Sequence, residues 1–421
     1  MRQDIICPAA LTEESLSAAV HDFFRRVYPD RARLFDYYRG EQGIPKGEAA
    51  RGRPNNHLRI PFPRYITEVQ TGYFLGQPPT FSFPKQEDGA AFAAASRALQ
   101  LEHLLFDIGR DISICGAGFL LLWLERSGLR GCRCDPLTCF SIRSGEAGAP
   151  LVGVVRLYDN GGTTGGILYQ KDALRPFLWD GQQAKFLNPR ENLLGAMPLI
   201  PFVNNCEGCG DFEPVTGLVD AYNLLISGAM DDMQSMANAF LALYGLQGTT
   251  QSDIDEANRS RVLSLHEGGK AEFVVKNLNH EALAQLEKNL RCNILQLSMT
   301  PDLSDEAFAG TASGVALQYK LWGIEQVRSA KERTFRDGLE ALLEAMSAGL
   351  RALGSPANLT ESQVVFYKNL PRDHAALAET LLSLAPVVSR RTILENLPWV
   401  MDVEEELRRK AEETDEQRME E

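Results

Sequence analysis

The stretch 299–314, MTPDLSDEAFAGTASG, lies between two segments with strong helical periodicity. It contains one proline, two glycines and three acidic residues, which is typical of a loop. Upstream, residues 281–299 repeat leucine and isoleucine at steps of three and four, and a similar pattern downstream continues to about Leu353. A helix from Gly314 to Leu353 would be about 60 Å long, more than a compact domain accommodates. This length predicts a coiled coil or a subunit of a large assembly.

The composition is that of an acidic globular protein. The 421 residues favour two or three domains, and 44% hydrophobic with 24% charged residues argues against disorder. The first residues lack the basic start and apolar run of a signal peptide, and no apolar run is long enough for a membrane span. The net charge of −13 argues against wrapping nucleic acid, which requires clustered Lys and Arg. It is compatible with a surface past which DNA slides without sticking.

The N-terminal half combines amphipathic helical patterns with short apolar runs typical of strands. Prolines, glycines and charged residues separate these runs, so we expect a mixed region with helices first and strands later. Expected helices cover residues 11–38, with a break near Pro29, 63–75 and 90–113; expected strands cover 120–125, 132–142, 152–157, 167–170, 174–179 and 198–203.

The clearest helical periodicity occurs at residues 214–241, and 281–299 repeats it. The residues between them, 244–280, are short and mixed, so the pattern predicts two helices that enclose a small α/β insert. Candidate strands in the insert are 262–265 and 273–275. Beyond the long helix we expect one strand at 364–367 and helices at 374–385 and 402–420.

A glycine-rich run at 160–166, NGGTTGG, could be mistaken for a phosphate-binding loop. Such a loop needs a helix after it and usually a lysine, whereas a strand pattern follows here. A β-hairpin loop is therefore the favoured interpretation.

The eight cysteines are scattered, which predicts free thiols in a reducing compartment rather than a disulfide framework. The gap between Cys206 and Cys209 suits a zinc knuckle, but the gap between Cys132 and Cys134 is one residue too short. We therefore favour incidental loop thiols over a metal site.

Other candidate catalytic or metal-binding groups are isolated. His57, His103 and His374 have no neighbouring carboxylate or cysteine at ligand spacing, and the pair Asp231-Asp232 has no nucleophile or histidine nearby. The sequence contains no Walker A motif, nucleophile elbow or HExxH motif. We therefore predict no enzymatic activity, no cofactor and no metal.

Four groups of motifs follow one another over roughly residues 30–400. They are YRG at 38–40 with NNHLRI at 55–60 and GYFLGQP at 72–78; GRDISICGA at 109–117; PLIPFVNN at 198–205 with GDFE at 210–213 and DAYN at 220–223; and the stretch 301–321. Each is weak alone, but their order and spacing resemble the portal proteins of tailed bacteriophages, in the family related to the portal of Bacillus phage SPP1.

The resemblance implies an α+β portal fold with a wing, a two-helix stem, a small α/β clip, a long channel-to-wing helix and a helical crown. By similarity, the wing would be residues 1–210, the stem helices 211–243 and 281–299, the clip 244–280, the tunnel loop 300–313, the long helix with its return to the wing 314–373, and a short crown 374–421.

The resemblance also implies a function and partners. About twelve copies would form a ring-shaped channel through which double-stranded DNA is packaged into the capsid and later ejected. The ring would dock the terminase large subunit and a head-completion adaptor, and would contact the scaffold and major capsid proteins. It would be located at one vertex of the virion, and in the host cytoplasm during assembly, with no membrane partner.

Two rival functions belong to other classes. One is a non-DNA scaffold with coiled-coil arms, which predicts dimers or trimers in solution. The other is a nucleotide-dependent enzyme that uses the 160–166 loop, which predicts nucleotide hydrolysis by the pure protein.

The resemblance makes the loop after Met299 the candidate DNA-facing segment, with a plain solvent-exposed connector as the alternative. Its acids would repel phosphates, its glycines would supply backbone freedom, and Ser313 would cap the long helix. The candidate residues are Thr300, Pro301, Asp302, Ser304, Asp305, Glu306, Phe308, Gly310, Ser313 and Gly314.

Basic residues form two further candidate groups. Those on the long helix would face DNA or neighbouring subunits, with a solvated helix face as the alternative. Those in the clip would take part in docking. The two groups are Lys320, Arg328, Lys331 and Arg333 on the helix, and Arg259, Arg261 and Lys270 in the clip.

Overall fold

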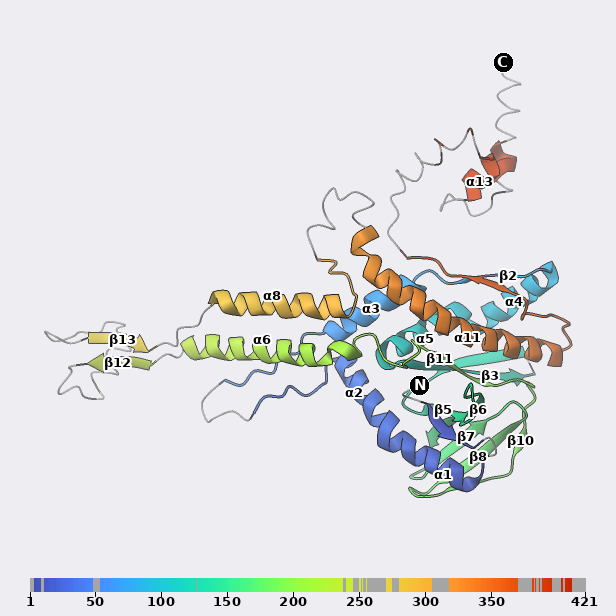
Figure 1. The fold of residues 1–421 in the computed structure, drawn as a ribbon, viewed down its shortest axis with the longest axis horizontal. Helices are drawn as coiled ribbons and strands as arrows, with labels where there is room; N and C mark the ends of the chain where they lie inside the picture. The colour runs from blue at the N-terminus through green and yellow to red at the C-terminus, as the bar shows by residue number, and fades with distance from the viewer. Residues whose placement is uncertain are drawn as a thin grey trace, which may run out of the picture. The chain divides into compact units, whose positions relative to one another are not determined.

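A computed structural model describes most of the chain, and its residues form two compact units, Met1–Lys368 and Asn369–Glu421 (Figure 1). In the second unit α13 (Arg390–Glu395) is described, and the few described residues within the predicted helices 374–385 and 402–420 are all helical. The described residues are 4–8, 11–47, 54–126, 128–237, 240–244, 250, 252, 255, 270–274, 280–304, 318–369, 381, 383, 386, 388–395, 403 and 406–410.

The N-terminal helices of the first unit confirm most of the expected pattern. The helical pattern is interrupted just before Pro29 by a π-helical segment, η1. Pro29 itself does not break the helix, because it lies in the first turn of α2, where its missing N–H costs nothing. The helix predicted at 90–113 is two helices, because Gln100 adopts a left-handed φ of 52° between them. The elements are α1 (Glu13–Asp22), η1 (Phe23–Val27), α2 (Tyr28–Arg39), α3 (Phe62–Leu75), α4 (Gln86–Leu99) and α5 (Leu101–Cys115).

A seven-stranded sheet carries α1 and η1 on one face, where Phe23 stacks on Phe140 with ring centroids 4.7 Å apart. Strand β1 pairs with β5 in parallel, and the remaining pairs are antiparallel. The order is β1-β5-β6-β7-β8-β10, with β9 paired to β8. The strands are β1 (Ile5–Cys7), β5 (Cys139–Ser144), β6 (Leu151–Asp159), β7 (Thr164–Tyr169), β8 (Ala173–Trp179), β9 (Ala184–Phe186) and β10 (Arg190–Glu191).

A second, three-stranded sheet has the order β11 (Leu199–Val203), β3 (Ala117–Glu125) and β4 (Gly128–Cys134). The strand predicted at 132–142 is therefore wrong, because β4 and β5 belong to different sheets. A turn separates them, in which the amide of Thr138 donates to the carbonyl of Asp135 at 3.0 Å. The sequence does carry a signal for this turn, the pair Asp135-Pro136, which is typical of turns.

The glycine-rich run forms the hairpin loop that was predicted. The amide of Asn160 donates to the carbonyl of Thr163 at 2.8 Å, and β6 and β7 pair antiparallel on either side. Gly161 and Gly162 have φ of 66° and 97°, which favour glycine. With a strand instead of a helix after it, the loop gives the nucleotide-dependent rival no phosphate site.

The long helix α11 (Trp322–Ala352) is shorter than expected, about 47 Å, and it is not a projecting arm. Its residues Phe335, Leu339 and Leu342 are fully buried, in the same apolar cluster as β11 and α5. The expectation that such a helix cannot belong to one compact unit is wrong, because helix and sheet run along each other. Residues 314–317 lie outside the described residues, and 318–320 are helical before a turn at Leu321.

The strand predicted near 364–367 is confirmed in part as β14 (Gln363–Val365), which pairs with β2 (Thr80–Ser82). The chain thus returns to the N-terminal helices after α11, and Phe366 stacks on Phe74 of α3 with centroids 5.4 Å apart.

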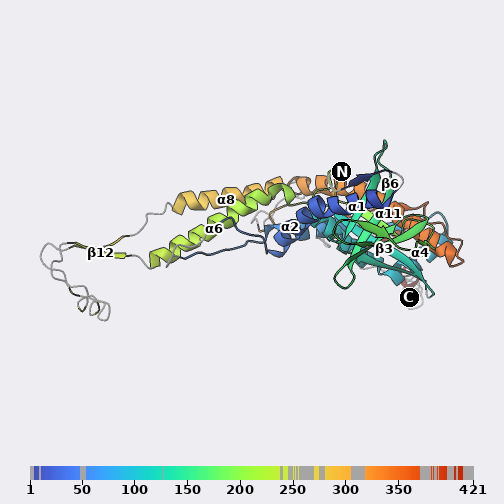
Figure 2. The ribbon, with the colours of Figure 1, turned by 90° about the horizontal axis from the view of Figure 1, so that it is seen from below.

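The two helices on either side of the insert are α6 (Thr216–Ala237) and α8 (His280–Leu297), which lie side by side in both views (Figures 1 and 2). A 3-10 turn, η2 (Glu213–Val215), leads into α6. The hydroxyl of Tyr222 donates to Glu287 at 2.6 Å across the pair.

Between α6 and α8 the chain forms an antiparallel strand pair, β12 (Phe240–Tyr244) and β13 (Lys270–Val274). The first helix was expected to reach residue 241, but Phe240 lies in β12. The predicted strand at 273–275 is confirmed in part by β13, and the one at 262–265 lies outside the described residues. Of the helices that the structure describes, none is both long and apolar enough to cross a membrane.

Candidate channel segment and its anchor

The candidate channel segment begins where α8 ends. Met299 has a left-handed φ of 52°, which is uncommon for a residue other than glycine, and the amide of Thr300 donates back to the carbonyl of Leu295 at 2.9 Å. This turn directs the chain away from the helix axis.

Two side chains of α3 then hold the segment 298–304, here called the anchor. The hydroxyl of Tyr65 donates to the carbonyl of Pro301 at 2.8 Å and accepts the amide of Leu303 at 3.0 Å. The amide group of Gln70 donates to the carbonyl of Ser298 and to the hydroxyl of Thr300, both at 3.2 Å. Gln70 is 2% exposed, so these bonds form away from water and fix the backbone.

Arg291 of α8 neutralises the first acid of the segment. Its guanidinium lies 2.9 Å from Asp302, whose carboxylate also accepts the hydroxyl of Ser304 at 2.7 Å. Burial alone would raise the pKa of Asp302, but the hydrogen bonds from Ser304 and the charge of Arg291 outweigh it and lower that pKa. Asp302 is therefore charged, and its charge is compensated within the subunit.

The anchor changes what the predicted channel residues can do. Thr300 is 4% exposed, so the prediction that it lines a channel is wrong. Pro301 and Asp302 are half-buried, and Ser304 is exposed. The remaining predicted residues lie outside the described residues: Asp305, Glu306, Phe308, Gly310, Ser313 and Gly314.

None of the three basic residues predicted for the clip has a described side chain. Arg259 and Arg261 lie outside the described residues, and of Lys270 only the backbone is described, at the start of β13.

A second device stabilises α6. Residues 54–61, here called the strap, run along this helix in the opposite direction. Every second backbone amide donates to a side chain of α6, and the three acceptors are one helical turn apart. The bonds are Ile60 to Asn223 at 2.8 Å, Leu58 to Ser227 at 2.9 Å and Asn56 to Asp231 at 2.7 Å. Two strand residues advance about 6.6 Å and four helix residues about 6.0 Å, so the two periods match over three bonds.

Asp231 ends this ladder and is not part of a catalytic pair. It accepts hydrogen bonds from Lys46 and Asn56, which lower its pKa to about 2. The signal in the sequence was the i, i+4, i+8 spacing of Asn223, Ser227 and Asp231, each of which can accept a hydrogen bond.

A buried ion pair joins α11 to the root of α6. The side chains of Lys331 and Asp211 contact each other and are only 2% and 4% exposed. Asp211 also accepts hydrogen bonds from Ser113 and, at 2.8 Å, from Asn204. Asp211 lies just before η2, so α5, α11 and the chain entering α6 meet at one carboxylate. The prediction that Lys331 faces DNA or a neighbouring subunit is wrong, because the side chain has no surface.

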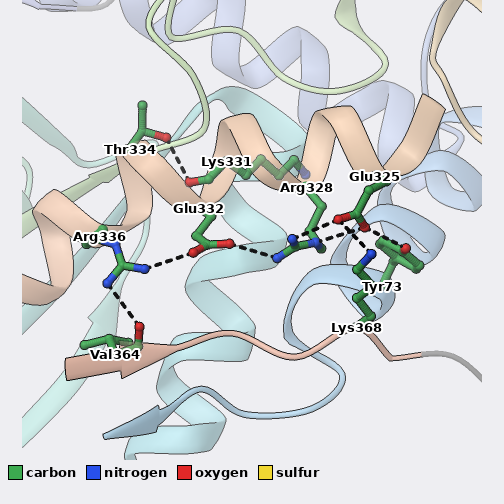
Figure 3. Close-up of polar contacts among 9 residues, drawn as sticks. All are labelled: Tyr73, Glu325, Arg328, Lys331, Glu332, Thr334, Arg336, Val364 and Lys368. Carbon is green, nitrogen blue, oxygen red and sulfur yellow. Dashed lines mark hydrogen bonds and ion pairs between the residues drawn. The ribbon is translucent and has the colours of Figure 1, made fainter. Parts of the chain in front are cut away.

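A ladder of charges runs along α11 towards the end of the first unit (Figure 3). Arg328 lies 2.9 Å from both Glu325 and Glu332, and Arg336 bonds Glu332 at 2.9 Å and the carbonyl of Val364 at 3.1 Å. The side chain of Arg328 is 11% exposed, so its charge is used inside the subunit rather than offered to a partner.

Glu325 connects this ladder to two other elements. Tyr73 of α3 donates to it at 2.8 Å, and Lys368 lies 3.1 Å away (Figure 3). Burial would raise the pKa of Glu325, but the hydrogen bonds from Arg328, Tyr73 and Lys368 outweigh burial and lower it. Of the four predicted basic residues on the long helix, Lys320 and Arg333 are the exposed ones.

A second buried acid, Asp111 of α5, gives a pH prediction. Burial raises its pKa to about 6, although the hydrogen bond from Arg133 at 2.6 Å acts in the opposite direction. Between about pH 4 and 6 the folded protein therefore holds a proton that the unfolded chain has released. As the pH rises from about 4 to 6, the free energy of unfolding should therefore fall by about 2–3 kcal/mol through this group.

The measurement is urea denaturation of the wild type and of Asp111→Asn from pH 4 to 7. The difference between the two curves should change with this slope, since other carboxylates contribute equally to both proteins. Parallel curves would contradict the assignment.

Among the described residues, no group of three or more His, Cys, Asp or Glu side chains is arranged to hold a metal ion. The eight cysteines are free thiols.

Comparison with known proteins agrees with this architecture. The family model described as "Phage portal protein, SPP1 Gp6-like" matches residues 23–420. The portal protein of Bacillus phage SPP1 is 23% identical over 224 residues, 52% of this chain and 44% of that protein. The portal protein of Clostridium phage phiCD119 is 23% identical over 221 residues, 51% of this chain and 48% of that protein. The aligned regions span less than half the length of either relative.

The fold is also found among solved structures. A chain from the neck of a native gene transfer agent (GTA) particle, computed with C12 symmetry, superposes with a TM-score of 0.51 at 10% identity, over 88% of this chain and 93% of that chain. The α+β portal fold predicted from the sequence is thereby confirmed. Since the family model covers nearly the whole chain, this protein is a member of the SPP1 Gp6-like family of phage portal proteins.

Proposed function

We propose that this chain is one subunit of a ring-shaped channel that passes double-stranded DNA into a phage capsid during packaging and out of it on infection. The observation that carries the proposal is the paired helices α6 and α8, whose far end forms β12–β13 and whose root is fixed to α3, α5 and α11. A rigid two-helix rod on a broad α/β base is a part that can be repeated around an axis. Family membership over residues 23–420 supports the same function.

A ring of about twelve copies agrees with the C12 symmetry used for the GTA neck, whose chain has this fold. In the ring, residues 1–210 would be the wing, 211–243 and 281–299 the stem, 244–280 the clip, and 374–421 the crown. Residues 314–373 would return from the channel to the wing.

The part of the tunnel loop that meets DNA would begin after Ser304. Tyr65, Gln70 and Arg291 hold the anchor, so it acts as a fixed root and not as a moving contact. The charge of Asp302 is compensated, which leaves Asp305 and Glu306 as the acids that would repel phosphates. Weak repulsion with few phosphate contacts would let a duplex slide in either direction.

The partners would be those of a portal vertex. The clip would dock the terminase large subunit and later the head-completion adaptor, and the wing would contact the scaffold and major capsid proteins. Energy for packaging would come from the terminase, a separate chain, and this subunit would act as a non-enzymatic conduit. It would be found in the virion and, during assembly, in the host cytoplasm.

A deletion tests the channel assignment. Removing residues 305–310 leaves the anchor intact, so rings should form normally while DNA packaging or retention is lost. Replacing the same six residues by a Gly-Ser segment of equal length separates the effects of length and chemistry. The measurements are ring formation by negative-stain microscopy and packaged DNA by nuclease protection. Normal packaging and retention in the deletion variant would contradict the proposal.

A further inference from the structure

Five large apolar side chains are exposed where α8 ends and α11 begins, and they are here called the junction patch. It contains two aromatic and three aliphatic residues, most of them more than half exposed, in two chain segments. The two segments lie next to each other, since a Cβ at Gly323 would be 3.5 Å from Met299. The members are Leu297 at 62%, Met299 at 50%, Leu303 at 54%, Tyr319 at 78% and Trp322 at 63% exposure.

The size of the patch indicates a protein partner. A whole aromatic side chain presents 150–250 Å², so Tyr319 and Trp322 alone expose about 300 Å². With the three aliphatic residues the patch reaches the range that marks interaction sites on soluble subunits. It would supply a large part of the roughly 800 Å² that one partner contributes to a stable interface.

The same chain carries an exposed, uncharged side on α6. Gly217, Ala221 and Leu224 share one side of this helix, at i, i+4 and i+7, and Ala221 and Leu224 are exposed. At Gly217, no described atom lies within 4 Å of the position that a Cβ would take. This side is uncharged and exposed, and two of its three residues are small, so it leaves room for large side chains of a partner.

The two surfaces also lie at the same end of the helix pair. Tyr222 of α6 bonds Glu287 of α8, and the two helices run in opposite directions, so Gly217 and Leu297 are both at the root. A rotation about an axis along the helices keeps surfaces at one level, and would bring the patch of one copy to α6 of the next.

We propose that the junction patch packs against the Gly217–Ala221–Leu224 side of α6 in an adjacent copy of this chain. This inference rests on the proposed ring. The contact joins two different surfaces and is therefore head-to-tail, which is the type that closes into a ring. Trp322 and Tyr319 would be its central side chains, since large aromatic residues buried at an interface contribute most to affinity.

Association of purified full-length protein gives the first test. Trp322→Glu should raise the concentration needed for half-maximal ring assembly at least about tenfold in sedimentation velocity. The matched control is Leu193→Glu, at a residue 70% exposed in the wing, which should leave assembly within about twofold. Circular dichroism of both variants checks that the subunit still folds.

Cross-linking gives the second test, in a background with Cys206→Ser and Cys292→Ser. The double variant Ala221→Cys/Leu297→Cys, which keeps both aromatic side chains of the patch, should give a ladder of oligomers up to the closed ring when treated with a short bis-maleimide. Neither single variant should do so, because each surface meets the other and not itself.

The outcomes separate this inference from the function it rests on. Rings that form normally with Trp322→Glu and no double-variant ladder would overturn the contact and leave the channel standing. Dimers cross-linked through a single variant would overturn it in favour of a symmetric contact. Normal rings that lose DNA with Trp322→Glu would overturn it in favour of a DNA-facing patch. A wild type that never assembles would overturn both.

Discussion

Replacing Lys331 by methionine should lower the free energy of unfolding of the first unit by about 3–5 kcal/mol. The methionine keeps much of the volume but leaves Asp211 as a buried carboxylate without its cation. The side chains of this pair are 2% and 4% exposed, so water cannot take the place of the ammonium group. Ser113 and Asn204 still donate to the carboxylate, but two neutral donors compensate less than a charge.

Two variants make this prediction specific. Arg333→Met, two residues away on an exposed face of α11, should change stability by less than about 0.5 kcal/mol. Lys331→Met combined with Asp211→Asn removes both charges and should recover a substantial part of the loss. Urea denaturation measures all three. If Lys331→Met were no worse than Arg333→Met, the pair would not join α11 to the root of α6 as described.

Gly116→Ala should destabilise the same region by at least about 3 kcal/mol. Gly116 has φ of 80°, and a Cβ there would lie 2.1 Å from the carbonyl oxygen of Gly208. That atom is backbone, so it cannot turn aside as a flexible side chain would. The carbonyl of Gly116 also accepts the amide of Asn204 at 3.1 Å, which links the end of α5 to the chain that leads into α6.

The control for this substitution is Gly72→Ala in α3, where no described atom lies within 4 Å of the new methyl group. Alanine has the higher helix propensity, so this variant should be neutral or up to about 1 kcal/mol more stable. Thermal and urea unfolding of both proteins provide the comparison. Equal effects at the two positions would contradict the close approach of Gly116 and Gly208.

The elements that the sequence predicted well are those whose pattern is purely local. Helices α6 and α8 and the strands β6, β7 and β8 have unbroken periodicity, and the glycine run between β6 and β7 has a local turn requirement that only glycine meets. The order of the motifs along the chain then indicated that these elements belong to a portal protein, and the match to the family model confirmed this.

The errors arose where a single residue or a tertiary contact decides. Gln100 divides a continuous helical pattern by a left-handed turn, which its residue type does not signal. The turn at Asp135-Pro136 sends β5 to another sheet, although a single strand was predicted across it. The periodicity of the long helix indicates only how long it is, so the helix was expected to extend beyond one domain. Its burial depends on β11 and α5, which are distant in sequence.

Charges within the candidate site were the least predictable. Asp302 is paired with Arg291, eleven residues earlier, and Lys331 with Asp211, 120 residues earlier. In the sequence nothing marks these charges as partners of one another. Only the fold shows that these charges are used in structure, and that the anchor depends on Tyr65 and Gln70 of α3.

The most direct test of the channel is the assembly state of the pure protein, by native mass spectrometry together with negative-stain microscopy. We expect annular particles with a central hole and a single copy number near twelve. A chain that stays a particle of 46.6 kDa at every concentration, and also when expressed with its capsid proteins, would contradict it.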